Sequence, residues 1–222
     1  MTDRTVACVF VPSETYTADW VYALQAQVAE NLGAHRFVCL TNEAVAGVEC
    51  VPLVNDWPGW WNKIELFRPG LLTGPTLYLD LDVLVIGRLE PLFRDGPGFS
   101  AVQDFLLPKT INSSAMAWEG RFGSIYASFE RMSDQMMRHY APGERHGLGD
   151  QAFILDHLTA AGQQIDRFPQ GQVVSFKRQA RHTPPHGARV VAFHGKPKMP
   201  DAPGWAAQRW EDLQLTINQT EE

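Results

Sequence analysis

The chain has 222 residues, 45% of them hydrophobic and 20% charged, which is enough to bury the core of one compact enzyme-sized domain. Its formal net charge of -6 at pH 7 offers no basic surface to nucleic acid or an anionic membrane, so any bound phosphate must be neutralised locally. No apolar run reaches the roughly 18 residues that span a bilayer, and none after the start resembles a signal peptide, so we expect a soluble, cytoplasmic protein without a transmembrane segment.

The first half of the chain predicts alternating strands and helices. Apolar, β-branched runs predict strands at 5–11, 36–40, 49–53 and 76–86. Apolar residues at helical spacing predict helices at 18–32 and 61–67. The run at 76–86 has the strongest strand signal, because it is apolar nearly throughout except for Asp80 and Asp82, as expected of a central strand buried on both faces.

The second half continues the pattern. Further strands are predicted at 99–103, 111–118 and 189–194, and further helices at 121–139, 150–161 and about 205–217. Strands separated by helix-length segments need crossover connections, so the sheet should be mostly parallel. The sequence therefore predicts one α/β domain, 1–222, in which a mostly parallel central sheet is flanked by helices.

Asp80 and Asp82 form the first candidate site. In an extended segment, carboxylates two residues apart point to the same side of the strand. Ionised carboxylates are costly to bury in an apolar frame unless a hard cation such as Mg²⁺ or Mn²⁺ binds them, and such an ion can also hold a diphosphate. The pattern favours a divalent-cation site; the alternative is a strand end whose acids cap a turn or pair with Arg or Lys.

The second candidate site lies at 190–198, where an apolar strand runs into His194. The neutral imidazole of His194 can bind a metal, and Gly195 lets the backbone approach an anion closely. Lys196 or Lys198 offers a positive charge to a phosphate. The alternative is a strand-end histidine followed by a solvated basic loop.

The order of these segments resembles the glycogenin-like and bacterial lipopolysaccharide galactosyltransferase-like retaining glycosyltransferases of the GT-A fold. The resemblance extends from Val6 to Lys198. Its pieces are an opening strand followed by Tyr16, then Trp61–Phe67, Tyr78–Asp82, Asp104, Ile111–Ser114, Gly149–Gln151 and Phe193–Pro197. It implies the nucleotide-diphospho-sugar transferase fold, a Rossmann-like domain with a nucleotide-binding half at about 1–90, an acceptor and catalytic half at about 91–200, and a C-terminal helix at about 205–217.

The resemblance also implies a function. The chain would be a hexosyltransferase that uses a nucleotide-diphosphate sugar, a UDP-sugar in the first instance, with retention at the anomeric carbon. The acceptor, whether glycan, lipid-linked or small molecule, is not identified by the sequence. Asp80, Asp82 and His194 would hold Mn²⁺ or Mg²⁺ between the donor phosphates.

The remaining roles follow from the same resemblance. The residues that would contact the donor are Val11, Tyr16, Lys63, Asp80, Lys196 and Lys198. Tyr16 would stack on the nucleobase and Lys63 would reach the donor sugar or phosphates. The four catalytic residues would be Asp150 and Gln151, facing the reacting carbon, with Asp104 and Asn112 between donor and acceptor. The His-Gly-Lys-Pro segment is shorter than the family's loop, so Lys198 is an alternative to Lys196.

Simpler structural interpretations stand beside these. Tyr16 could cover the first helix, Lys63 could be a solvated helix residue, Asn112 could be satisfied at a strand end, and Asp150 could be a helix N-cap. Four tryptophans, which could stack on sugar faces, are expected to pack in the core instead: Trp57, Trp60, Trp61 and Trp118.

Two rival functions also remain. A sugar nucleotidyltransferase would use acids on a strand end, but it would also use a glycine-rich loop after the first strand, and the segment from Val11 to Tyr16 contains no glycine. A non-catalytic nucleotide-sugar-binding relic is the other rival.

Overall fold

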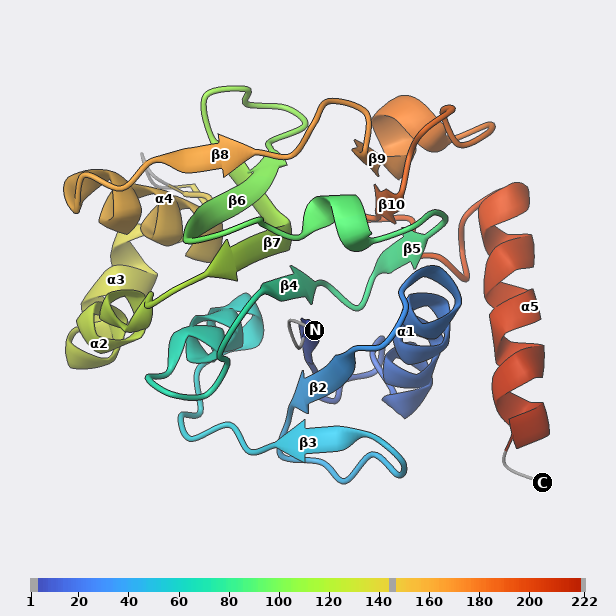
Figure 1. The fold of residues 1–222 in the computed structure, drawn as a ribbon, viewed down its shortest axis with the longest axis horizontal. Coiled ribbons are helices and arrows are strands. Elements are labelled where there is room, and N and C mark those ends of the chain that lie inside the picture. Colours follow the sequence, from blue (N-terminus) through green and yellow to red (C-terminus); the bar gives the residue numbers. More distant parts are fainter. Residues whose placement is uncertain (1–3, 144–146, 221–222) are drawn as a thin grey trace.

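The computed structural model describes residues 4–143 and 147–220. Its main element is a seven-stranded sheet with the spatial order β3-β2-β1-β4-β7-β6-β8 (Figure 1). The strands are β1 (Thr5–Val9), β2 (Arg36–Leu40), β3 (Glu49–Val51), β4 (Thr76–Leu79), β6 (Gly98–Gln103), β7 (Ile111–Glu119) and β8 (Ile165–Arg167). β7 is antiparallel to β4 and β6, and the other neighbouring pairs are parallel, which confirms the predicted mostly parallel sheet.

A second sheet has the order β5-β10-β9. Its strands are β5 (Val83–Val85), β9 (Val173–Ser175) and β10 (Val190–Ala192). β10 is parallel to β9 and antiparallel to β5, with Ala192 opposite Val83. The backbone N–H of Phe193 then donates to the carbonyl of Asp82 at 3.0 Å, so the pairing brings the end of β10 to the start of β5.

Helices cover both faces of the large sheet (Figure 1). On one face α1 (Ala18–Asn31) packs against α5 (Trp205–Thr220), and the ring centroids of Trp20 and Trp210 lie 4.6 Å apart. The other face is covered by η1 (Gly59–Phe67), α2 (Gly123–Arg131), α3 (Ser133–His139) and α4 (Asp150–Ala160); the short helices η2 (Glu90–Leu92) and η3 (Phe176–Ala180) lie in loops. Among the helices of the described residues, none is long and apolar enough to cross a membrane.

The central strand β4 contributes to two hydrophobic cores. Leu77 and Leu79 pack in the core beneath α1 and α5, whereas Tyr78 packs in the core beneath η1, α2 and α4. Successive side chains of a strand point to opposite faces, so a strand between two helical layers is apolar on both sides. This is why the sequence signal of β4 is so strong.

The predicted continuous strand at 76–86 is wrong. The chain leaves β4 after Leu79, turns at Leu81 and Asp82, and continues as β5 in the smaller sheet. Apolar periodicity does not reveal the break because both strands and Leu81 are buried. Asp80 and Asp82 therefore lie at the junction between two sheets rather than on one face of a single strand.

Other predicted elements differ in type or extent. The single helix predicted at 121–139 is two helices, since the chain breaks at Met132, whose φ is -140°. The helix predicted at 61–67 is a 3-10 helix that begins at Gly59. Strands β8 and β9 were not predicted, because three-residue strands carry too short a pattern.

The tryptophans divide into two groups. Trp57, Trp61 and Trp118 are buried, as predicted. The prediction for Trp60 is wrong, since its side chain is 48% exposed. Trp61 stacks on Phe129 in the core, whereas Trp60 points to a different side of η1 and is not part of that core.

Candidate functional site

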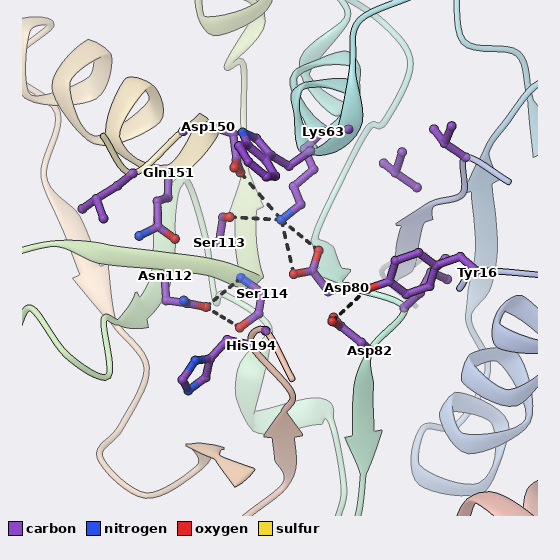
Figure 2. A pocket seen from close by; sticks show the side chains of 18 of the residues that line it. Tyr16, Lys63, Asp80, Asp82, Asn112, Ser113, Ser114, Asp150, Gln151 and His194 are labelled. Carbon is purple, nitrogen blue, oxygen red and sulfur yellow. Dashed lines mark hydrogen bonds and ion pairs between the residues drawn. The ribbon is translucent and has the colours of Figure 1, made fainter. Parts of the chain in front are cut away.

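A cavity of about 730 Å³ lies at the carboxyl ends of β1 and β4 (Figure 2). Ligands of parallel α/β sheets collect at this edge. Most of the residues predicted for the site line the cavity, namely Val11, Tyr16, Lys63, Asp80, Asp82, Asn112, Asp150, Gln151, His194 and Lys198. Asp104 and Lys196 are absent from the described wall, and Lys196 is exposed.

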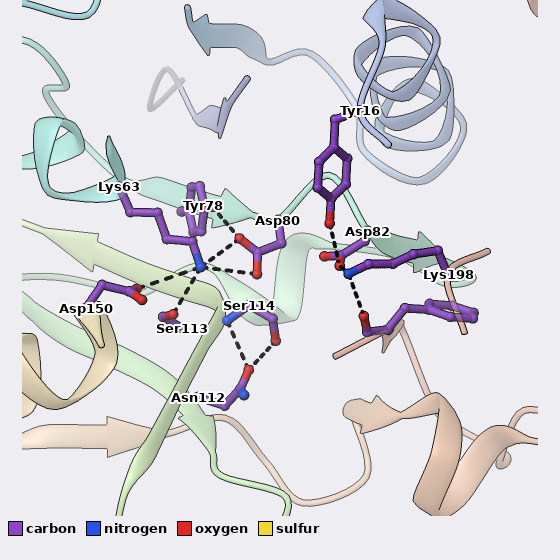
Figure 3. A network of polar contacts seen from close by, with 11 residues as sticks. Tyr16, Lys63, Tyr78, Asp80, Asp82, Asn112, Ser113, Ser114, Asp150 and Lys198 are labelled. Atoms are coloured by element: carbon purple, nitrogen blue, oxygen red, sulfur yellow. Dashed lines mark hydrogen bonds and ion pairs between the residues drawn. The ribbon is translucent and has the colours of Figure 1, made fainter. Parts of the chain in front are cut away.

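Lys63 is at the centre of the polar network in the cavity (Figure 3). Its Nζ lies 2.9 Å from Asp80 Oδ1, 3.1 Å from Ser113 Oγ and 3.7 Å from Asp150 Oδ2. Burial works against this charge, but the charges of Asp150 and Asp80 outweigh it and raise the pKa of Lys63. Lys63 is therefore a permanent ammonium group between two carboxylates, not the solvated helix residue of the simpler interpretation.

Asp82 occupies a separate part of the wall and has two partners (Figure 3). The hydroxyl of Tyr16 donates to Asp82 Oδ2 at 3.0 Å, and the Lys198 ammonium donates to the same oxygen. Burial raises the pKa of Asp82, the charge of Asp80 raises it further, and Lys198 opposes both. The two carboxylates thus repel each other within one cavity, a cost that a cation removes.

Asp150 is almost completely buried, at 4% exposure. It is the first residue of α4, and Gly149 occupies the N-cap position, so the N-cap interpretation of Asp150 is wrong. Burial raises the pKa of Asp150, against the charge of Lys63. Its Oδ2 is buried without a hydrogen-bond partner among the described residues, and it faces the Lys63 ammonium at 3.7 Å.

Asp104 lies behind the two amides rather than in the cavity. Its Oδ2 accepts from Asn112 Nδ2 and from Gln151 Nε2, each at 3.4 Å. Its Oδ1 accepts from the backbone N–H groups of Leu106 and Leu107, both at 2.8 Å. The geometry therefore suits a role in orienting Asn112 and Gln151, and the predicted place of Asp104 between donor and acceptor stays a prediction.

His194 follows β10 and lines the same cavity (Figure 2). Its Nε2 lies 2.7 Å from Ser175 Oγ, and its ring stacks on Phe105 with the centroids 5.3 Å apart. Burial and the nearby Lys177 lower the pKa of His194, which favours the neutral imidazole that a metal requires.

The three predicted metal ligands share a cavity without sharing one coordination sphere. Within the described residues, no three His, Cys, Asp or Glu side chains gather closely enough to hold a metal. Asp80 is paired with Lys63, and Asp82 with Lys198. The ligand types and the repulsion between the carboxylates fit a divalent cation, and Asp82 would have to release Lys198 to bind one.

The structure adds polar residues to which the sequence assigned no role. Tyr78 donates its hydroxyl to Asp80, Ser113 contacts Lys63, and Ser175 contacts His194. Tyr78 and Ser113 stand inside the segments that carry the family resemblance, so proximity to the motif is a usable signal. Ser175 lies in the unpredicted strand β9, and no signal in the sequence indicates it.

Solved structures of several glycosyltransferases share this fold. The galactosyltransferase LgtC, in complex with donor and acceptor sugar analogs, has a TM-score of 0.65 and 17% identity over 96% of this chain and 95% of that chain. GlyE of Streptococcus pneumoniae TIGR4 has a TM-score of 0.66 and 14% identity over 99% of this chain and 63% of that chain. The bifunctional glycosyltransferase WbbM has a TM-score of 0.64 and 11% identity over 98% of this chain and 51% of that chain.

No protein-family model matches the sequence, and no curated protein matches it either. The structural likeness confirms the predicted α/β fold of the GT-A glycosyltransferases. At these low identities it shows the fold alone, and one fold can host many activities.

Proposed function

We propose that the chain is a hexosyltransferase that uses a nucleotide-diphosphate sugar, such as a UDP-sugar, together with Mn²⁺ or Mg²⁺. One observation carries the proposal. The β5–β10 pairing brings His194 and Lys198 from the end of the chain to the cavity that holds Asp80 and Asp82. Two carboxylates, an imidazole and a lysine around one cavity form a suitable site for a cation and the diphosphate that it would neutralise.

The transfer is a displacement at the anomeric carbon of the donor. The acceptor hydroxyl oxygen forms a bond to that carbon, and the bond from the carbon to the diphosphate oxygen breaks. The bonding electrons leave with the diphosphate, and the hydroxyl proton passes to the departing oxygen. When bound, the divalent ion would supply Lewis-acid stabilisation of the charge that builds on the diphosphate.

The side chains of the cavity suit the rest of this reaction. The ammonium group of Lys198 would leave Asp82 and pair with the diphosphate. Lys63 would stay beside the donor sugar, between Asp80 and Asp150. The negative charge of Asp150 and the amide of Gln151 would stabilise the positively charged, oxocarbenium-like sugar. We favour stabilisation without a covalent intermediate, and net retention rests on the family resemblance.

Tyr16 and Val11 line the opposite part of the wall and would contact the nucleobase. Tyr16 is held at its hydroxyl by Asp82 and at its ring by Trp20, whose centroid is 5.1 Å away. The ring therefore covers the first helix and faces the cavity at the same time. A fixed aromatic ring can stack on a base at a low entropic cost.

The hydrogen bonds of the loop after β1 argue against nucleotidyl transfer. Ser13 Oγ accepts from the backbone N–H groups of Thr15 and Tyr16, at 3.3 and 3.0 Å. These N–H groups are satisfied within the loop rather than directed at a triphosphate, as a phosphate-binding loop requires.

A donor-turnover assay tests the proposal. Purified protein is incubated with a panel of nucleotide sugars and Mn²⁺ or Mg²⁺, and release of nucleoside diphosphate is measured with and without chelator. We expect metal-dependent release from at least one nucleotide sugar. Pyrophosphate release from a sugar 1-phosphate and a nucleoside triphosphate would support the nucleotidyltransferase instead, and binding without any turnover would indicate the relic.

A further inference from the structure

Trp60 is a large aromatic side chain at the mouth of the cavity. It is 48% exposed and lines the cavity, whereas Trp57, Trp61 and Trp118 are buried. Burying an indole against a ligand removes apolar surface from water, which favours binding. An exposed indole in a cavity wall is therefore available to a ligand.

The geometry of η1 fixes the direction of Trp60. In a 3-10 helix, residues three apart lie on the same face. Trp60 and Lys63 share one face and both line the cavity, while Trp61, Ile64 and Phe67 share another face and are buried. The indole therefore lies one helical turn from the ammonium that contacts Asp80 and Asp150.

The indole of Trp60 packs directly over Gly149, which has no side chain to exclude it. A Cβ on Gly149 would stand 2.5 Å from Trp60 Nε1, and the backbone of Gly149 has a φ of +62°. Glycine is thus required twice, for its backbone conformation and for the space that the indole occupies. Asp150, the next residue, lines the same cavity, and its Oδ2 lies 3.7 Å from the Lys63 ammonium.

An exposed aromatic side chain in a cavity whose wall also carries polar groups fits a sugar ring. One face of a pyranose presents C–H groups that pack on an aromatic ring, and its edge presents hydroxyl donors. Pro142 and Leu148 extend the apolar side of this wall, and Gln151 adds a polar group. Trp60 is both exposed to solvent and part of the cavity wall.

We propose that the acceptor is a saccharide and that Trp60 selects it by stacking on its terminal ring. This inference rests on the proposed glycosyltransferase function. The stacked ring would direct a hydroxyl toward Asp150 and Gln151, where the donor sugar reacts. Trp60 is then a specificity-determining residue and takes no part in the bond changes.

The first test uses fluorine NMR of protein labelled with 5-fluorotryptophan. The chain has seven tryptophans, and the Trp60 signal is the one lost in Trp60→Phe. Methyl galactoside, methyl glucoside, methyl N-acetylglucosaminide and lactose are titrated in the presence of UDP and Mn²⁺. We expect at least one saccharide to shift the Trp60 signal. A shift produced by UDP alone, or no shift with any of the four saccharides, overturns the inference.

The second test is kinetic and separates acceptor from donor effects. Trp60→Ala should raise the KM for a saccharide acceptor about ten-fold, the order expected for one aromatic stacking contact, and Trp60→Phe should restore most of the loss. Leu215→Ala removes an apolar side chain that is 61% exposed on α5, away from the cavity, and serves as the matched control. An unchanged acceptor KM in Trp60→Ala, or preferred transfer to a serine- and threonine-containing peptide, contradicts the inference.

Donor hydrolysis by the wild-type protein distinguishes failure of the proposed function from failure of the acceptor inference. If no nucleotide sugar is turned over, the proposed function fails and the acceptor inference fails with it. If nucleotide sugars are hydrolysed but the Trp60 tests give the contradicting results, only the saccharide inference fails.

Discussion

The ammonium group of Lys198 is paired with the carboxylate of Asp82, across the junction between the end of β10 and the start of β5. The same ammonium lies 5.5 Å from the centroid of the Tyr16 ring, and Tyr16 donates its hydroxyl to Asp82. A positive charge of the chain itself thus neutralises one of the two predicted carboxylate ligands. A cation and a diphosphate that bind here would compete for Asp82 and Lys198 respectively.

This pairing predicts opposite effects of one substitution on two ligands. Lys198→Met should increase the affinity of the nucleotide-free protein for Mn²⁺, because Asp82 loses a competing charge. It should weaken UDP binding about ten-fold or more, since a hydrogen bond to a charged group is lost. Both constants are measurable by titration calorimetry.

Lys196→Met is the matched control, because Lys196 is exposed and lies outside the cavity wall. We expect it to leave both affinities close to those of the wild type. Equal weakening of UDP binding by the two variants, or an effect of Lys196→Met alone, would contradict the proposed role of Lys198.

We predict that the buried carboxylate of Asp150 lowers the stability of the fold while it serves sugar transfer. Since burial raises the pKa of Asp150 above its unfolded value, its ionisation lowers the free energy of unfolding. This cost is absent below the unfolded pKa, develops as the pH rises from the unfolded pKa to the folded pKa, and is complete above the folded pKa. Asp150→Asn should therefore raise Tm near neutral pH, with a smaller effect in acid, while sugar transfer falls about a hundred-fold.

Thermal unfolding at several pH values and a transfer assay measure the two effects. Lys63 keeps Asp80 and Ser113 as partners in this variant, so its charge remains satisfied. A clear fall in Tm for Asp150→Asn would mean that the Lys63–Asp150 pair stabilises the fold, which is the opposite of the predicted effect.

We predict that substitutions at Gly149 and Trp60 are coupled in their effects on the free energy of unfolding. Gly149→Ala should destabilise the protein by about 2–3 kcal/mol or more, because it combines a positive φ with a collision against the indole. Trp60→Ala in the same chain should recover the part due to the collision but not the part due to the backbone. Denaturant unfolding of the single and double variants gives the coupling free energy.

Gly162→Ala is the control for backbone strain alone. Gly162 has a φ of +67°, and nothing lies within 4 Å of its added Cβ. We expect it to cost about 1–2 kcal/mol. If Gly149→Ala costs no more than Gly162→Ala, the indole does not lie over Gly149 as described.

The sequence predicted the large sheet well because that sheet follows local rules. β1, α1 and β2 alternate with strong apolar patterns, and β4 is buried on both faces. Prediction failed where tertiary contacts override the pattern. The apolar run at 76–86 continues through a change of sheet, and β8 and β9 are strands only because they pair with β6 and β10.

The residues of the candidate site show the same division. Asp80, Asp82 and His194 could be named as candidates because polar residues at the ends of apolar strands are unusual, and all three line the cavity. The choice between Lys196 and Lys198 could not be made, since it depends on the path of the loop after β10. The exposure of Trp60 depends on what packs around η1, which apolar spacing over one short segment does not reveal.

The central claim is that Asp82 and His194 bind one cation that is needed for diphosphate binding. Titration calorimetry of UDP, with Mn²⁺ and with chelator, tests it on the wild type, Asp82→Asn, His194→Ala and the double variant. We predict that Mn²⁺ tightens UDP binding in the wild type, that either substitution abolishes this gain, and that the double variant is no worse than either single one. Equal UDP affinity with Mn²⁺ and with chelator in the wild type, or fully additive losses, would contradict it.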